Sequence, residues 1–354
     1  MPPPREVTRR TATVGALAAI AGAAVLASRA ADAAPTAPVA AAALNRPRLP
    51  DAEPSAAPAS PPSAVRRQSG PRPARDLPRG GRTLFPAHRV VAFCGLPGAP
   101  ALGRLGVGRL DDRVRELEAL AGRHRGTGDL EREPLPALEL VTVVAQARPG
   151  DDGRYRTRVD AAVVEAHLAA ARRHRALLLL NVQPGRSDFG TEVRALERWL
   201  REPDVGLALD PEWRVGPGQR PGQVLGRVTG RELDGVSAWL ADLVAGRDLP
   251  EKMLVVHQLA PSVVRAPAPL RRRPGVRAVR SVDGIGTPAQ KRRTWDRVQR
   301  PAPAAGRREA ASGDGVLRAG FKIFLGEDTR GGSRLMTPAE TLALDPAPDY
   351  VCFE

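Results

Sequence analysis

Val205-Gly-Leu-Ala-Leu-Asp-Pro-Glu212 is a short apolar run that ends in two acidic residues. It is apolar at consecutive positions and too short for a typical helix, as expected of a strand buried in a parallel sheet. Seven further runs of this kind, most of them with polar ends, are spread over the chain from residue 89 onward. They are Arg89–Cys94, Leu138–Gln146, Ala176–Gln183, Lys252–Gln258, Val276–Gly284, Phe321–Asp328 and Asp349–Glu354.

Helical patterns fill most of the gaps between these runs. Apolar residues have helical spacing over residues 110–120, 159–170 and 193–200, and Thr229 and Thr337 each precede a glutamate by three residues, as in a capping box. This alternation predicts a single (β/α)₈ barrel of the TIM type, in which the carboxyl ends of the strands carry the chemistry. The eighth helix is missing, so either the segment before Val90 covers the last seam or the barrel is open there.

Composition divides the chain into three parts. Residues 1–33 contain Arg9-Arg10 before a weakly apolar stretch and an A-x-A pattern at Ala31–Ala33, which predicts a cleaved twin-arginine signal peptide. Residues 34–82 are rich in Pro, Ala and Arg and predict a disordered linker. Residues 83–354 predict the barrel domain. We therefore expect a secreted or cell-surface protein that contacts the export machinery transiently, or a membrane-anchored one if the signal is not cleaved.

Charge and aromatic content limit the choice of partners. The formal net charge is +15, and the arginines are spread over linker, helices and loops. This spread favours a solvated arginine-rich surface, while attraction to an anionic cell-wall component stays open. Aromatic residues make up 3% of the chain, too few for the stacking platforms of single-strand binders, so we expect no nucleic-acid partner.

Two cysteines, Cys94 and Cys352, lie on the first and the last predicted strand. In a closed barrel these strands are neighbours, so the pair could form a disulfide, which export favours. Two buried reduced thiols are the alternative, because adjacent parallel strands seldom provide disulfide geometry.

Polar residues at the strand ends predict a functional site at the mouth of the barrel. Residues two apart on a strand share a face, so the polar endings indicate which positions face inward. Each of them could also simply begin a loop. For Lys322, early in its predicted run, we expect a counter-ion of Glu354 or Asp283 rather than a Schiff-base lysine. The predicted inward set is Gln146, Asn181, Gln183, Asp210, Glu212, His257, Asp283, Lys322 and Glu354.

Asp210 and Glu212 form the sharpest local motif. Two like charges this close raise one pKa, so that one group stays protonated while the other ionises, as glycosidic cleavage requires. Leu207–Trp213 resembles the D-x-E strand end of family 18 chitinases and family 25 lysozymes, without the longer acidic run upstream that chitinases have. The resemblance implies that Glu212 is the proton donor and that Asp210 assists it.

The barrel region from Val90 to Glu354 also resembles a family of exported actinobacterial proteins. This resemblance implies the barrel and the export, and it supplies no reaction. The motifs that carry it are Gly95–Gly98, Gln183–Phe189, Ala208–Trp213, Val256–Gln258 and Asp283–Gly286.

Two further residues suggest ligands less directly. Arg186, with the first amides of the following helix, could hold an anion, although a plain turn and helix cap explains the same residues. His257 could be a base or a metal ligand. The five histidines form no H-x-H or H-E-x-x-H pattern, so we expect no metal ion and no cofactor.

The function predicted from these residues is an exported hydrolase that cleaves a cell-wall or extracellular polysaccharide. Glu212 is the expected general acid and Asp210 its partner, with Asp283 or Glu354 as the opposing carboxylate. A non-catalytic polysaccharide-binding barrel and a metal-dependent phosphodiesterase-like barrel remain as alternatives. The residues expected to bind the carbohydrate polymer are Gln146, Asn181, Gln183, Arg186, Trp213, His257 and Lys322.

Overall fold

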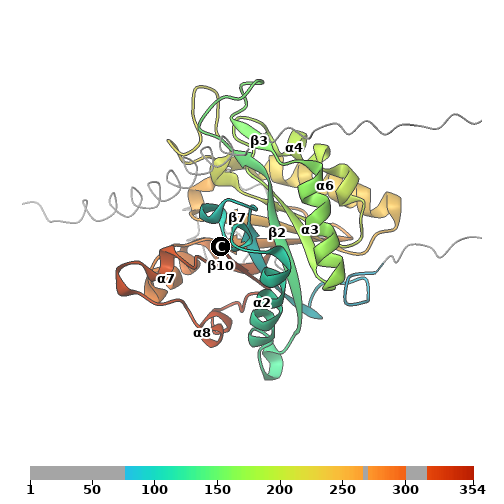
Figure 1. The fold of residues 1–354 in the computed structure, drawn as a ribbon, viewed down its shortest axis with the longest axis vertical. Helices are drawn as coiled ribbons and strands as arrows, with labels where there is room; N and C mark the ends of the chain where they lie inside the picture. The colour runs from blue at the N-terminus through green and yellow to red at the C-terminus, as the bar shows by residue number, and fades with distance from the viewer. Residues whose placement is uncertain (1–75, 266–269, 300–316) are drawn as a thin grey trace, which may run out of the picture.

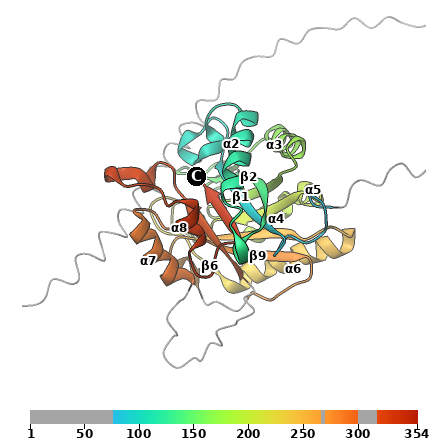
Figure 2. The same cartoon turned by 90° about the horizontal axis from the view of Figure 1, so that it is seen from below.

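The computed structural model describes residues 76–265, 270–299 and 317–354. Eight parallel strands form a closed barrel with helices around it, which confirms the predicted TIM-type fold (Figures 1 and 2). The barrel closes because β1 pairs with β2 on one side and with β11 on the other. The strands are β1 (His88–Gly95), β2 (Glu133–Ala145), β4 (Leu177–Val182), β5 (Val205–Leu209), β7 (Lys252–Gln258), β9 (Val276–Val282), β10 (Leu317–Ile323) and β11 (Tyr350–Phe353).

Helices follow most of the strands. They are α2 (Leu110–Arg123), α3 (Ala161–Arg173), α4 (Phe189–Ala195), α5 (Glu197–Leu200), α6 (Gly230–Arg247), α7 (Pro288–Gln299) and α8 (Pro338–Leu342). Between β7 and β9 the described residues form only short elements, in a proline-rich stretch that disfavours a helix. The remaining short elements are β3 (Arg156–Arg158), β6 (Val228–Thr229), β8 (Val264–Arg265), η1 (Pro100–Leu102), η2 (Arg104–Gly106), η3 (Gly128–Leu130), η4 (Pro211–Trp213), η5 (Pro261–Val263) and η6 (Glu327–Gly332).

The apolar core has two shells because side chains alternate along each strand. One shell fills the barrel interior and includes Ala92, Leu179 and Val255. The other lies between the strands and the helices and includes Leu180 and Val256. When the same alternation is continued toward the carboxyl ends of the strands, the polar residues there face the barrel interior.

A register shift in β2 changes which of its residues face inward. The pairing of β2 with β4 is irregular between Val141 and Val143. Such a bulge moves every residue beyond it to the opposite face. Glu139 therefore lies inside the barrel and is fully buried, although the alternation counted back from Gln146 predicts that it faces outward.

The seam between β1 and β11 is closed without an eighth helix. Its outer face is covered by rings: Phe93 and Phe353 meet edge to face at 6.3 Å, and His124, at the end of α2, lies 5.5 Å from Phe353. The buried Arg89 donates hydrogen bonds to the carbonyls of Pro348, His124, Arg125 and Leu130. The expectation that the barrel could be open here is wrong.

The segment before β1 closes the amino end of the barrel instead of covering the seam. Leu77, Leu84 and Phe85 are buried in the inner apolar shell. The amide of Leu84 donates to Glu251, immediately before β7, at 2.7 Å. Leu77 falls in the stretch predicted as linker, yet it packs on the barrel.

The described residues contain no helix that is both long enough and apolar enough to span a membrane. The predicted signal peptide, residues 1–33, lies outside the described residues, as does the predicted linker up to residue 75.

Candidate active site

A cavity of about 280 Å³ lies at the carboxyl end of the barrel. Its polar lining combines Gln183, Asp210, Glu212, Asp283, Lys322, Glu327 and Glu354 with Arg104. Apolar residues that include Leu102, Val107, Trp213, Leu259, Ile285, Phe324 and Leu325 form much of the remaining wall. A pocket with apolar walls and a few convergent polar groups is the usual form of a small-ligand site.

The turn after β1 approaches this cavity closely through Gly103. Its φ is +115°, and a Cβ atom there would lie 3.0 Å from Cγ of Glu354 and 2.5 Å from the carbonyl oxygen of Cys94. Only glycine combines this backbone conformation with so close an approach. The turn therefore forms part of the cavity wall beside Glu354.

Asp210 and Glu212 both line the cavity, but they do not share a strand as predicted. β5 ends at Leu209, and Glu212 belongs to the 3₁₀ turn Pro211–Trp213. Proline has no amide hydrogen for the sheet, so the ladder stops before Glu212. Asp210 is held in place by the side-chain amides of Asn181 and Gln183, which donate to its two oxygens at 3.1 and 3.2 Å.

Glu212 is a buried acid without a hydrogen-bond partner for one of its oxygens. Among the residues that the structure describes, none pairs with its buried Oε2 atom. Burial, reinforced by the negative charges of Asp210 and Asp283, raises the pKa of Glu212 well above its usual range. Glu212 is therefore held as the neutral acid, with a proton available to a group in the cavity.

His257 connects two carboxylates beneath the cavity. It is fully buried, with Nδ1 2.8 Å from Asp283 and Nε2 2.9 Å from Glu139. Burial alone would lower the pKa of His257, but the charges of Asp283 and Glu139 raise it well above its usual value. The ring is thus an imidazolium that donates to both carboxylates.

Glu139 is ionised in this network despite its complete burial. Burial opposes the charge, but His257 and Lys322 outweigh it and lower the pKa of Glu139 to about 2. The hydroxyl of Tyr350 donates to its second oxygen. Glu139 is thus an ionised carboxylate buried within the network, and it is not part of the cavity lining.

Lys322 is the counter-ion of both predicted partners. Its Nζ atom lies 3.1 Å from Asp283 and 2.8 Å from Glu354. These charges raise the pKa of Lys322 well above its usual value, although burial opposes the shift. β10 ends at Ile323, so Lys322 lies near the carboxyl end of its strand, not near the beginning as predicted.

Asp283 and Glu354 differ in how fully their oxygens are used. Asp283 accepts from Ser281 on one oxygen and from His257 and Lys322 on the other. The side chain of Glu354 forms a hydrogen bond or ion pair only with Lys322 among the described residues, and that side chain is 26% exposed. Burial raises the pKa of Glu354 despite the neighbouring Lys322. Both oxygens of Asp283 are therefore occupied by hydrogen bonds within the network, whereas Glu354 has an oxygen facing the cavity.

Four predicted binding residues do not line the cavity. Asn181 and His257 lie directly below it and hold the lining carboxylates. Gln146 and Arg186 lie elsewhere, each in contact with Tyr155: the amide of Gln146 donates to its carbonyl, and the guanidinium of Arg186 stacks 4.1 Å from its ring centre. Arg186 also donates to the carbonyl of Gln219, so it braces loops. The prediction that Gln146 and Arg186 belong to the site is not supported by this placement.

Glu139 is the main member of the cluster that the strand endings do not indicate. Its signal in the sequence is a single charge inside an apolar run, Leu138-Glu-Leu140. Buried charges of this kind need a partner, which here is His257. Because of the bulge in β2, the alternation counted back from Gln146 does not predict that Glu139 faces inward.

The chain matches no protein-family model, no curated protein and no solved structure. Fold and site together define a TIM-type barrel with a buried cluster of carboxylates, one imidazolium and one ammonium group below a carboxyl-end cavity. Function is therefore argued from this geometry.

Proposed function

We propose that the protein is an exported glycoside hydrolase that cleaves a cell-wall or extracellular polysaccharide by carboxylate acid–base catalysis. The observation that carries the proposal is Glu212, a buried carboxylic acid that lines the cavity and has a strongly raised pKa. A glycosidase needs such a group to protonate the oxygen of the departing sugar. Ionised carboxylates next to it stabilise the positive charge that develops on the sugar ring.

Glu354 is the opposing carboxylate in this mechanism. β11 is the fourth strand from β5 in either direction round the barrel, so Glu354 lies across the mouth from Glu212. Its unoccupied oxygen can accept a proton from water, whereas Asp283 is saturated by hydrogen bonds. In inverting enzymes the two carboxyl groups lie about 6.5–9.5 Å apart, which leaves room for a water molecule between base and sugar, and inversion is the outcome that we expect for carboxyl groups on opposite walls.

Asp210 and Trp213 complete the site. Asp210 is fixed by Asn181 and Gln183 and directs its charge toward the reacting carbon. The ring of Trp213 and the apolar residues opposite offer flat surfaces to the carbon–hydrogen faces of a sugar. The cavity is at the lower end of the usual ligand-pocket range of about 300–1,000 Å³, so we expect it to enclose one sugar unit.

The test is to incubate the full-length chain with isolated cell-wall and extracellular polysaccharides and to measure new reducing ends and the anomeric form of the product. A hydrolase with this geometry releases reducing ends with inversion. Retention on insoluble polymer without product would instead indicate the binding barrel. Activity on a phosphodiester that a chelator abolishes would replace the proposal by the metal-dependent alternative.

A further inference from the structure

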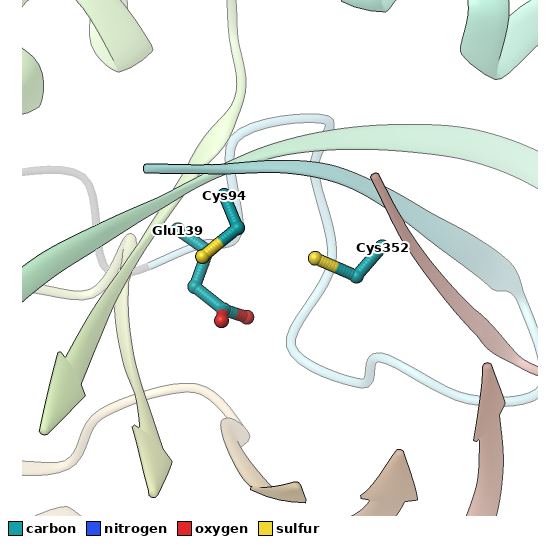
Figure 3. Close-up of side chains that lie close together, drawn as sticks. All are labelled: Cys94, Glu139 and Cys352. Carbon is teal, nitrogen blue, oxygen red and sulfur yellow. The ribbon is translucent and has the colours of Figure 1, made fainter. Parts of the chain in front are cut away.

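A second cluster of reactive side chains lies inside the barrel, one layer below the cavity. Cys94 from β1, Glu139 from β2 and Cys352 from β11 point toward one another in the interior (Figure 3). All three are buried, and one ligand atom of each lies within 4.8 Å of the others. We propose that these three side chains bind one divalent transition-metal ion, with zinc as the best match to their chemistry.

The strand register favours a metal ion over a disulfide. Cys94 lies directly opposite Glu139, whereas Cys352 lies opposite Ala92 and is therefore diagonal to Cys94. Diagonal neighbours on one face of a sheet have Cα atoms about 7–8 Å apart, beyond the usual disulfide range of about 4.4–6.8 Å. Both cysteines are free in the structure. A metal ion about 2.3 Å from each sulfur tolerates the wider spacing.

The ligand types select the metal. Two thiolates and one carboxylate form a mixed soft and hard set of the kind that Zn²⁺ accepts in tetrahedral geometry. The fourth position is adjacent to the hydroxyl of Tyr350, which already donates to Glu139. Calcium and magnesium prefer oxygen ligands throughout, so this cluster disfavours them.

The surroundings orient the carboxylate and balance the charge. Glu139 is held by Nε2 of His257 at 2.9 Å and by Nδ2 of Asn181 at 2.9 Å, so its position is set before an ion binds. On binding, each thiol releases its proton to solvent. The two thiolates and the carboxylate then carry three negative charges, of which a divalent ion offsets two and the His257 imidazolium, 2.9 Å from Glu139, the third.

The location indicates a structural role. β11, β1 and β2 are three adjacent strands at the seam where the barrel lacks its eighth helix. An ion shared by all three would tie the first and last strands together from inside. Histidine spacing does not indicate this metal site, because its ligands are two cysteines and a glutamate on three strands that the closed barrel brings together.

The test uses the full-length chain, produced without a histidine tag, incubated with Zn²⁺ under reducing conditions and freed of loosely bound ion. Elemental analysis should give about one zinc per chain. The Co²⁺ form should show thiolate-to-cobalt charge transfer and the visible bands of a tetrahedral ion. Addition of a strong chelator should lower the thermal midpoint of the loaded protein.

Two variants and a control decide the assignment. Cys94→Ala and Cys352→Ala keep small apolar groups in the core, and each should retain about one tenth or less of the wild-type zinc. His174→Gln removes a histidine on the helical shell that lies 3.4 Å from Glu118, and it should bind zinc normally. Substoichiometric zinc in the wild type, full zinc in both cysteine variants, a cobalt spectrum without thiolate bands, or the absence of free thiols in the denatured protein would each overturn the proposal.

Discussion

The two ends of the barrel differ in which side chains line the opening. At the amino end, residues 76–87 fill the opening, and apolar side chains such as Leu84 complete the inner core. At the carboxyl end, the opening stays hollow and is lined by five acids, of which Asp210, Glu212 and Asp283 are buried. The contrast indicates that one end of this barrel supplies stability, whereas the other gives up some stability in order to hold reactive groups.

Two buried lysines show the same contrast at the level of single charges. Lys252, at the start of β7, donates only to the carbonyls of Glu202 and Val205 at 2.5 and 2.7 Å, and burial lowers its pKa to about 7. Lys322, near the end of β10, faces Asp283 and Glu354, which raise its pKa. Equal burial thus has opposite consequences, because Lys322 forms ion pairs with two carboxylates, whereas the charges of Asp204 and Glu202 offset the effect of burial on Lys252 only in part.

The largest effect is expected from Lys322→Met. Removing the cation leaves Glu354 without its ion-pair partner and Asp283 with His257 alone, so the free energy of unfolding at neutral pH should fall by about 3 kcal/mol or more. Lys252→Met is the matched control and should cost much less, because no buried acid loses its partner. Denaturant unfolding of both variants measures the difference. Equal losses would show that the two ends do not differ electrostatically.

Glu212→Gln should separate catalysis from stability. The general acid is lost, so turnover of the polysaccharide should fall by roughly 10²-fold or more. The free energy of unfolding should change by less than about 1 kcal/mol, because Oε2 of Glu212 makes no hydrogen bond with any described residue. Glu165→Gln, whose side chain is 63% exposed on α3, is the control and should keep wild-type turnover. Unchanged turnover in Glu212→Gln would exclude this residue as the acid.

Leu84→Ala probes the opposite end. The leucine is fully buried in the inner shell, so its truncation should lower the free energy of unfolding by about 2 kcal/mol or more. Turnover measured well below the thermal midpoint should not change. Leu130→Ala, at a position 40% exposed, should cost less than about 0.5 kcal/mol. A drop in turnover for the folded Leu84→Ala protein would contradict the division between the two ends.

The last prediction concerns the pH dependence that Lys252 confers on stability. Between the folded pKa of Lys252, about 7, and the ordinary lysine pKa of 10.5, the unfolded chain binds the proton and the folded chain does not. Raising the pH through this window therefore favours folding, by about 1.4 kcal/mol per pH unit at most. The free energy of unfolding of the wild type minus that of Lys252→Met should rise accordingly from pH 7 to 10. A difference that stays flat with pH would show that Lys252 keeps its charge in the folded state.

The sequence by itself determined the barrel and the end at which its polar groups gather. Eight apolar runs with mostly polar ends are a local, repeated signal, and parallel strands place all their carboxyl ends on one side. Asp210, Glu212, Asp283, Lys322 and Glu354 could for this reason be predicted to meet. Gln146 also ends a predicted run and Arg186 follows one in a turn, but both contact Tyr155 and lie outside the cavity lining.

Only the tertiary structure decided the orientation, the partners and the protonation state of these groups. A bulge in β2 turned Glu139 inward, the strand register brought the ligand atoms of Cys94, Glu139 and Cys352 within 4.8 Å of one another, and burial left Glu212 protonated while hydrogen bonds saturated Asp283. Each of these outcomes depends on burial and on partners from distant strands. Local periodicity carries no information about either, because a pKa and a ligand set are properties of the assembled interior.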